Sequence, residues 1–237
     1  MTAADLTPIA IPEDAQGPAD AAARTEVWLI RHGESEGNHA GLLQGQQDYP
    51  LSARGRLQAK RLAERLGAVS FDALYSSDLT RALDTARAVA ATTIGQTVVV
   101  DPRLREIDIG TWSGLTPAEI HVRFPDEYAG WLRRRDPTHR RGGGESYLDL
   151  QQRITPTVTE IAQRHLGGRI AIVAHGGSIN AYLCGILGIP LDGMWRLAQD
   201  NTAINRVQPF TNPNEDPSTR PGRVLAINDA LHVDADG

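Results

Sequence analysis

The chain has 237 residues, of which 41% are hydrophobic and 22% are charged, and its formal net charge is −5. This length allows one globular domain with a sizeable core, and the acidic balance argues against nucleic-acid binding. No apolar run approaches the roughly 18 residues that a membrane span needs. The single cysteine, Cys184, excludes an internal disulfide framework and suits a reducing, cytoplasmic location. Its apolar neighbours predict a buried core thiol.

Residues 1–24 are rich in Ala, Pro and Asp and show no periodic apolar face. Acidic residues and prolines interrupt the apolar core that a signal peptide requires. We therefore expect a disordered extension over 1–24 and a single domain over 25–237.

Two stretches that lie far apart in the sequence share one pattern, an apolar run that ends in polar residues. The apolar run 27–30 predicts a buried strand that ends at Arg31 and His32, and the run 169–174 predicts another that ends at His175. Ligands usually bind at the carboxyl ends of strands in an α/β sheet. Either stretch alone also fits a strand that ends in an ordinary polar turn. Together they predict that both histidines lie in one crevice.

The rest of the chain alternates between helical spacing and short apolar runs, which predicts an α/β sheet with helices on both faces. Helices are expected over 52–66, 78–91, 116–124, 146–165 and 178–187, and further strands over 71–75, 97–100, 202–208 and 223–228. Loops are expected over 33–50, 101–115 and 209–222, and an irregular basic segment over 125–145.

Two local features carry sharper expectations. The continuous apolar run Thr97–Val100 is typical of a strand that is covered on both faces. Pro156 should kink the long helix or leave a gap in its hydrogen bonds.

Five polar residues near the ends of these elements suggest one reaction. Arg31 and Arg81 offer planar cations, and with His32 and His175 they would form a pocket for a phosphoryl dianion. Without a metal, phosphoryl transfer needs this clamp, a nucleophile such as a neutral imidazole, and an acid–base group. Glu106 could be that group. Taken alone, however, Glu106 also fits a salt-bridge partner, and Arg81 fits a solvated surface charge. The remaining histidines lack metal-ligand spacing, so we expect no metal site.

The motifs that contain these residues resemble the histidine phosphatase superfamily, in the branch with the cofactor-dependent phosphoglycerate mutases. The resemblance covers about residues 26–233. It rests on Arg31-His32-Gly33-Glu34-Ser35 with Asn38, Gln44-Gly45, Pro50-Leu51-Ser52, Ser76-Ser77-Asp78-Leu79 with Arg81, Leu104-Arg105-Glu106, Gly143-Gly144-Glu145-Ser146 and Val173-Ala174-His175-Gly176-Gly177.

This resemblance implies a three-layer α/β/α sandwich with a mostly parallel central sheet. It also implies a phosphohistidine intermediate on His32, with Glu106 as proton donor and then base. Arg31, Arg81 and His175 would hold the phosphoryl group. No metal and no dissociable cofactor would be needed. The implied substrate contacts are Ser35, Asn38, Gln44, Gly45 and Gly176.

One departure from the mutases bears on the type of reaction. Where the mutases share Glu-Arg-His-Tyr-Gly, this chain has Glu106-Ile107-Asp108-Ile109-Gly110, which favours hydrolysis over transfer. The expected activity is a metal-independent phosphomonoesterase for small phosphorylated metabolites, such as sugar phosphates or phosphoglycerate-like acids. A mutase and an inactive protein that binds a phosphorylated ligand are the alternatives. A homodimer is compatible with the sequence.

The resemblance also implies a lid insertion at about 116–145. Its part 131–145 holds five arginines and ends in three glycines before Glu145. One interpretation is a solvated basic surface. The other is a lid whose cations select substrates with a second anionic group.

Overall fold

The computed structural model describes residues 24–93, 97–134, 136–211 and 222–233. The predicted extension therefore lies outside the described residues except for Arg24. In the described part, a six-stranded sheet has the order β3-β2-β4-β1-β5-β6. The strands are β1 Glu26–Arg31, β2 Ala73–Ser76, β3 Val98–Val100, β4 Arg169–Ala174, β5 Ile204–Gln208 and β6 Arg223–Asp229.

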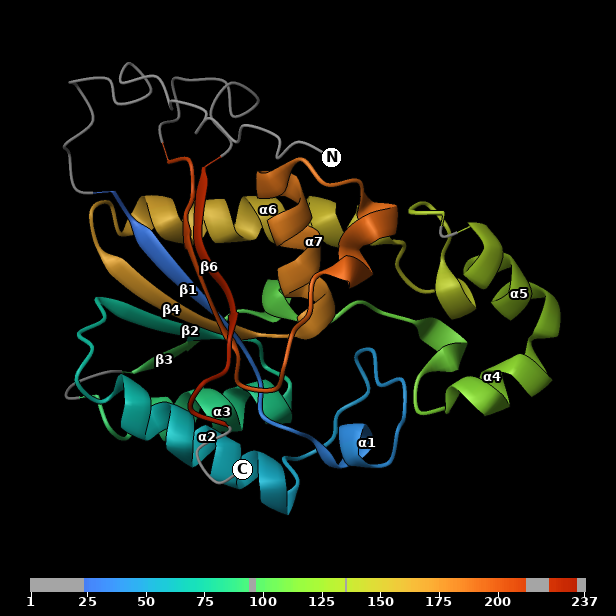
Figure 1. The fold of residues 1–237 in the computed structure, drawn as a ribbon, viewed down its shortest axis with the longest axis horizontal. Coiled ribbons are helices and arrows are strands. Elements are labelled where there is room, and N and C mark those ends of the chain that lie inside the picture. The colour runs from blue at the N-terminus through green and yellow to red at the C-terminus, as the bar shows by residue number, and fades with distance from the viewer. Residues whose placement is uncertain (1–23, 94–96, 135, 212–221, 234–237) are drawn as a thin grey trace, which may run out of the picture.

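Helices cover both faces of this sheet (Figure 1). The first four strands pair in parallel, whereas β5 and β6 are antiparallel. The expected three-layer sandwich with a mostly parallel sheet is therefore confirmed. The helices are α1 Glu36–His39, α2 Ala53–Leu66, α3 Thr80–Ala90, α4 Pro117–Arg123, α5 Pro125–Arg134, α6 Tyr147–Arg164 and α7 Gly176–Leu187.

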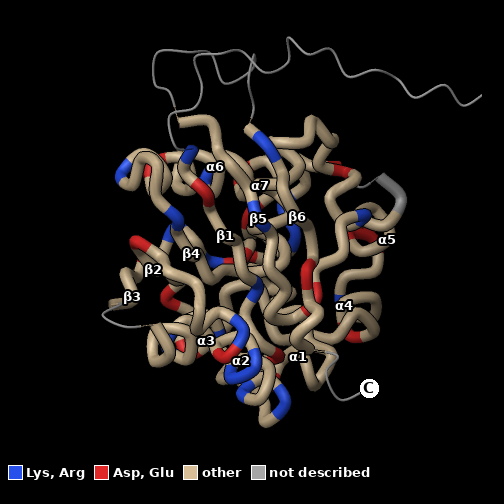
Figure 2. The backbone as a smooth tube through the Cα atoms, turned by 60° about the vertical axis from the view of Figure 1, so that its left-hand side comes forward, with Lys and Arg blue, Asp and Glu red and all other residues tan. Residues whose placement is uncertain are grey.

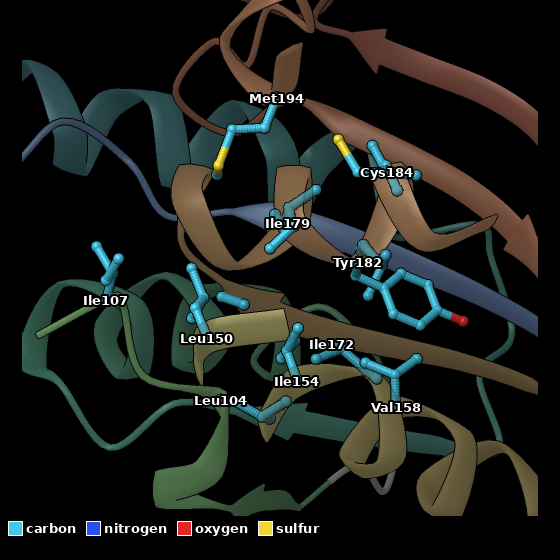
Figure 3. Close-up of a cluster of buried hydrophobic side chains, with 14 of the residues drawn as sticks. Leu104, Ile107, Leu150, Ile154, Val158, Ile172, Ile179, Tyr182, Cys184 and Met194 are labelled. Carbon is cyan, nitrogen blue, oxygen red and sulfur yellow. The ribbon is translucent and has the colours of Figure 1, made fainter. Parts of the chain in front are cut away.

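The core has two layers because successive strand side chains point to opposite faces of the sheet. Ile172 packs with α6 and α7 in the cluster shown in Figure 3. Leu29 belongs to the same cluster. Ile30 and Val173 pack with α2 and α3 on the other face. Cys184 is 1% exposed in the first layer, as expected of a core thiol. Charged residues gather on outer segments such as α2, while the central strands carry few (Figure 2).

The register of the two central strands brings the predicted crevice together. Arg31 is paired with Ala174 at the last position of β1 and β4. The next residues, His32 and His175, therefore leave the sheet side by side. The His32 N–H also donates to the Ala174 carbonyl at 3.0 Å.

Three local predictions are wrong. The strand over 98–100 is an edge strand, and Val99 and Val100 are each 45% exposed, because β3 pairs with β2 alone. The segment 125–145 is not irregular throughout, since α5 occupies its first ten residues and packs Tyr128 and Trp131 against the core. The 33–50 loop contains the short helix α1.

The long helix α6 continues through Pro156 without ending. Proline has no N–H to donate, so it removes one helical hydrogen bond, which is the milder of the two expected outcomes. Across the described residues, the search for a helix long and apolar enough to span a membrane finds none.

Candidate active site

His32 follows the carboxyl end of β1, and its side chain is buried. Its Nδ1 lies 2.6 Å from the carbonyl oxygen of Gly33, which can only accept a hydrogen bond, so Nδ1 carries the proton. The lone pair of the neutral ring is therefore on Nε2. Burial and the nearby Arg81 and Arg31 cations hold the pKa of His32 well below its usual 6.5. The ring is thus neutral at pH 7, as a nitrogen nucleophile must be.

Two arginines beside His32 are held by backbone carbonyls. Arg81, 1% exposed, donates to two carbonyl groups of the 45–47 loop at 2.9 and 2.8 Å. Arg31 donates to the carbonyl of Gln199. Within the described residues, the buried Nε of each arginine has no hydrogen-bond partner. Carbonyl dipoles therefore fix the two guanidinium groups without neutralising them, which suits a dianionic ligand.

His175 completes this group of side chains. Its ring centroid lies 5.1 Å from that of His32, and its two ring nitrogens are buried with no partner in the described part of the chain. Burial, Arg81, the His32 ring and Arg31 lower the pKa of His175 well below 6.5. A neutral imidazole has one N–H, and this donor has no acceptor among the described residues.

Glu106 is tied to the helix that follows His175. Its Oε2 accepts the Gly177 N–H at 3.0 Å, and its Oε1 accepts the Ile107 N–H at 2.9 Å. A Cβ at position 177 would lie 2.4 Å from Glu106 Oε1, so any side chain at this position would displace the carboxyl group. The carboxyl group therefore has a fixed position relative to the two histidines.

A second layer of contacts holds the Glu106 loop from behind. Arg153 on α6 donates to the carbonyls of Arg103, Arg105 and Glu106 at 2.7, 3.0 and 3.2 Å. The same guanidinium forms two 2.8 Å bonds with the Glu145 carboxylate. Arg153 thus joins the loop that contains Glu106 to the segment that contains Glu145, and we call it the Arg153 clamp.

A cavity of about 530 Å³ opens in front of these groups. Eight of the ten predicted site residues line it, and they come from segments far apart in the sequence. They are Arg31, His32, Asn38, Gln44, Gly45, Arg81, Glu106 and Gly176. His175 reaches the site through its contact with the His32 ring.

Ser35, expected to contact substrate, is not one of the residues that line this cavity. It is fully buried, and its hydroxyl caps α1 by accepting the Asn38 N–H at 3.1 Å. The same hydroxyl donates to Gln44 Oε1 at 2.7 Å. Its geometry is that of a residue that orients Asn38 and Gln44.

The far end of the cavity has a different chemistry. Arg141 is 5% exposed, and its Cζ lies 4.4 Å from the Tyr147 ring centroid and 5.8 Å from that of Trp131. The Tyr147 hydroxyl accepts N–H groups from Trp131 at 3.3 Å and Trp195 at 2.7 Å. All four side chains line the cavity. We call these four residues the aromatic end.

Several of these contacts were missed by sequence reasoning. Gln199, which holds Arg31, and Asn201, whose side chain donates to the His32 carbonyl at 3.0 Å, follow an irregular segment with no periodic signal. Gly177 belongs to the motif that ends the 173–177 stretch, but the hydrogen bond from its N–H to Glu106 forms only in the folded protein. Over the described residues, no cluster of three or more His, Cys, Asp and Glu could hold a metal ion.

Comparison with known proteins places this site in a family. The profile of the "Histidine phosphatase superfamily (branch 1)" matches residues 27–214. "Phosphoserine phosphatase 1" of Hydrogenobacter thermophilus is 34% identical over 76% of this chain and 84% of its own. "Probable phosphoglycerate mutase GpmB" of an Enterobacter species is 34% identical over 89% of this chain and 95% of its own.

A solved structure agrees with this placement. A mutant phosphoserine phosphatase from Entamoeba histolytica, in complex with phosphoserine, superposes with a TM-score of 0.75 at 26% identity. The match covers 88% of this chain and 98% of that one. The chain therefore belongs to the histidine phosphatase superfamily, branch 1.

Proposed function

We propose that this chain is a metal-independent phosphoric monoester hydrolase that acts through a phosphohistidine on His32. The observation that carries the proposal is the state of that ring. Its Nδ1 proton is held by the Gly33 carbonyl, and its pKa is lowered by burial and two cations, so Nε2 is a free nucleophile. The uncompensated Arg31 and Arg81 lie where a phosphoryl group would meet this nitrogen.

In the first half of the reaction, Nε2 of His32 attacks phosphorus and the bond to the substrate alcohol breaks. Arg31, Arg81 and the N–H of His175 stabilise the charge on the phosphoryl oxygens. Glu106, in its protonated form, gives its proton to the leaving alkoxide. The positive charge that develops on the His32 ring is stabilised by the Nδ1–H bond to Gly33.

In the second half, the Glu106 carboxylate takes a proton from water as the water oxygen attacks phosphorus. The bond between phosphorus and Nε2 breaks, and inorganic phosphate leaves. His32 returns to its neutral form and Glu106 is again protonated, so protons and electrons balance over the cycle.

The substrate class that we propose is small phosphorylated metabolites, such as sugar phosphates or phosphoglycerate-like acids. A relative named a phosphoserine phosphatase and a neighbour that holds phosphoserine support this class. The mutase alternative has less support, because Ile107 and Ile109 line the cavity where a bisphosphorylated cofactor would need cations.

Hydrolysis of p-nitrophenyl phosphate and 3-phosphoglycerate in the presence of a chelator tests this proposal. Both substrates should release phosphate, and added 2,3-bisphosphoglycerate should not convert 3-phosphoglycerate to 2-phosphoglycerate. Loss of all turnover on chelation would contradict the metal-independent mechanism, and isomerisation without phosphate release would favour a mutase.

We further propose a cytoplasmic location, in keeping with the single buried thiol, and a lid role for residues 116–145. The lid would close the aromatic end, since Trp131, Leu132 and Arg141 from this segment line the cavity. Cell fractionation tests the first of these proposals. Protection of the segment from proteolysis by a bound phosphate ester tests the second.

A further inference from the structure

No carboxylate of the described residues contacts the cation at the aromatic end. Arg141 is 5% exposed, and it forms no ion pair with a carboxylate in the described part of the chain. Its Nη2 is buried with no hydrogen-bond partner there. A buried guanidinium is costly unless its charge and its donors are satisfied. The two aromatic rings and the Tyr147 side chain stabilise the charge, but the N–H groups of the buried Nη2 stay without an acceptor among the described residues.

The position of Arg141 is built into the fold. The Gly142 N–H donates to Glu127 Oε1 at 2.7 Å, and a Cβ at position 142 would lie 2.4 Å from the Ile109 carbonyl. Gly142 also has a φ of 55°, which favours glycine. Tyr147, under the guanidinium, is fixed by two indole N–H groups. The cation is therefore held in place before any ligand arrives.

We propose that Arg141 is a second anion site, which binds a carboxylate on the alcohol part of the phosphomonoester. This inference rests on the proposed function, because the phosphate of the same molecule would occupy Arg31, Arg81 and the histidines. It assigns the substrate to phosphorylated hydroxycarboxylic acids. The planar fork of arginine matches a carboxylate with two parallel hydrogen bonds.

The surroundings favour a carboxylate over a second phosphate. The phosphoryl end has two arginines and two imidazoles for one dianion, whereas the aromatic end offers Arg141 with apolar walls such as Trp131 and Trp195. One cation neutralises a monoanion. Arg141 itself is 5% exposed, so little water screens an ion pair that it forms.

Arg140, the neighbouring arginine, provides a matched control. Its side chain is 61% exposed and pairs with Asp149 at 2.9 Å, and it is not one of the residues that line the cavity. The side chains of residues 133–135 lie outside the described part. Of the lid arginines predicted to select substrate, the inference therefore assigns the role to Arg141 rather than to Arg140.

The experiment compares two substrates that differ at one group. 3-Phosphoglycerate has a carboxylate where glycerol 3-phosphate has a hydroxymethyl group. We expect R141Q to lower the ratio of their kcat/KM values by roughly 10- to 100-fold, the value of a charge-assisted hydrogen bond. R141K should recover part of the ratio, and R140Q should leave it unchanged. R141M, which keeps the packed stem, replaces R141Q if that variant does not fold.

A ratio that stays constant in R141Q and R141M, or that falls equally in R140Q, would overturn the inference. Binding separates this failure from that of the proposed function. In the H32A background, titration calorimetry with 3-phosphoglycerate should show weaker binding when R141Q is added, even if the wild type hydrolyses neither substrate. Equal affinity with and without R141Q would overturn the carboxylate site while leaving the hydrolase mechanism intact.

Discussion

The two ends of the cavity are built in different ways. At the phosphoryl end, Arg31, His32 and His175 lie at or directly after the ends of neighbouring parallel strands, and backbone carbonyls hold the side chains of Arg31 and His32. At the aromatic end, Arg141 and Trp195 come from short 3₁₀ helices outside the sheet. The residues that act on the phosphoryl group, which every substrate shares, thus lie on the rigid sheet. The residues that would contact the variable part of the substrate lie on connections, which tolerate sequence change.

The largest effect should come from His32. If the phosphoryl end alone carries the chemistry, H32A should lower kcat on the order of 10⁴-fold or more on every phosphate ester, whatever its alcohol. Steady-state assays on p-nitrophenyl phosphate and 3-phosphoglycerate measure this loss. Full activity of H32A on either ester would contradict the claim that the phosphoryl end carries the chemistry.

Replacing Glu106 should have a smaller effect that depends on the leaving group. E106Q should cost roughly 10²- to 10⁴-fold on 3-phosphoglycerate, because a sugar-type alcohol needs a proton. The loss on p-nitrophenyl phosphate should be much smaller, since nitrophenolate departs unprotonated. Equal losses on both esters would assign Glu106 a structural role.

The Arg153 clamp should act through Glu106. Because a displacement of about 1 Å can cost 10²-fold, we expect R153M to lower kcat on 3-phosphoglycerate by about 10- to 100-fold. In the E106Q background the same change should have little further effect. R103Q, at an exposed arginine paired with Asp101 and Glu160, is the control. A full additional loss in the double variant would show that Arg153 acts elsewhere.

A still smaller effect concerns stability and pH. His175 has a lowered pKa in the folded protein, so its ring takes up a proton in the unfolded chain first as the pH falls below 6.5. The stability that depends on a neutral His175 ring is therefore complete above pH 6.5. It is lost as the pH falls toward the pKa that His175 has in the folded protein. H175Q should reduce the dependence of unfolding free energy on pH in that window by up to about 1.4 kcal/mol per pH unit.

Denaturant unfolding between pH 5 and 7 measures this dependence. Leu166, which is 69% exposed and does not titrate, provides the control L166Q, which should keep the wild-type dependence. An unchanged dependence in H175Q would mean that the ring is not neutral in the folded protein.

The two central strands were predictable because each contains a continuous apolar run, 27–30 in β1 and 170–174 in β4, that ends at a polar motif. The strand β3 shows the limit of this reasoning, since three valines are equally compatible with a central strand and with an exposed edge. Helix α5 escaped prediction because the arginines after Trp131 suggested an irregular basic surface. Its aromatic residues find their partners only in the folded protein, where Tyr128 and Trp131 pack near Trp112.

The phosphoryl end was predictable for a related reason. Its residues are adjacent to the strands that position them, so sequence order translates directly into proximity. Arg141 differs, because its burial depends on Gly142 contacting the 109–111 turn and on Tyr147 from α6. No periodicity separates it from Arg140, which is exposed one residue earlier. Ser35 was expected to touch substrate, and only the fold shows its hydroxyl turned toward α1.

The central claim is that His32 becomes phosphorylated, and rapid acid-free quenching of the enzyme with a phosphate ester tests it most directly. E106Q should accumulate the intermediate, because a phosphoryl group transferred from p-nitrophenyl phosphate then lacks the base that activates water. The account predicts a label that is stable to base, labile to acid and located by peptide mass spectrometry on His32 alone. A label on another residue, or release of phosphate with no labelled enzyme at any time, would contradict the account.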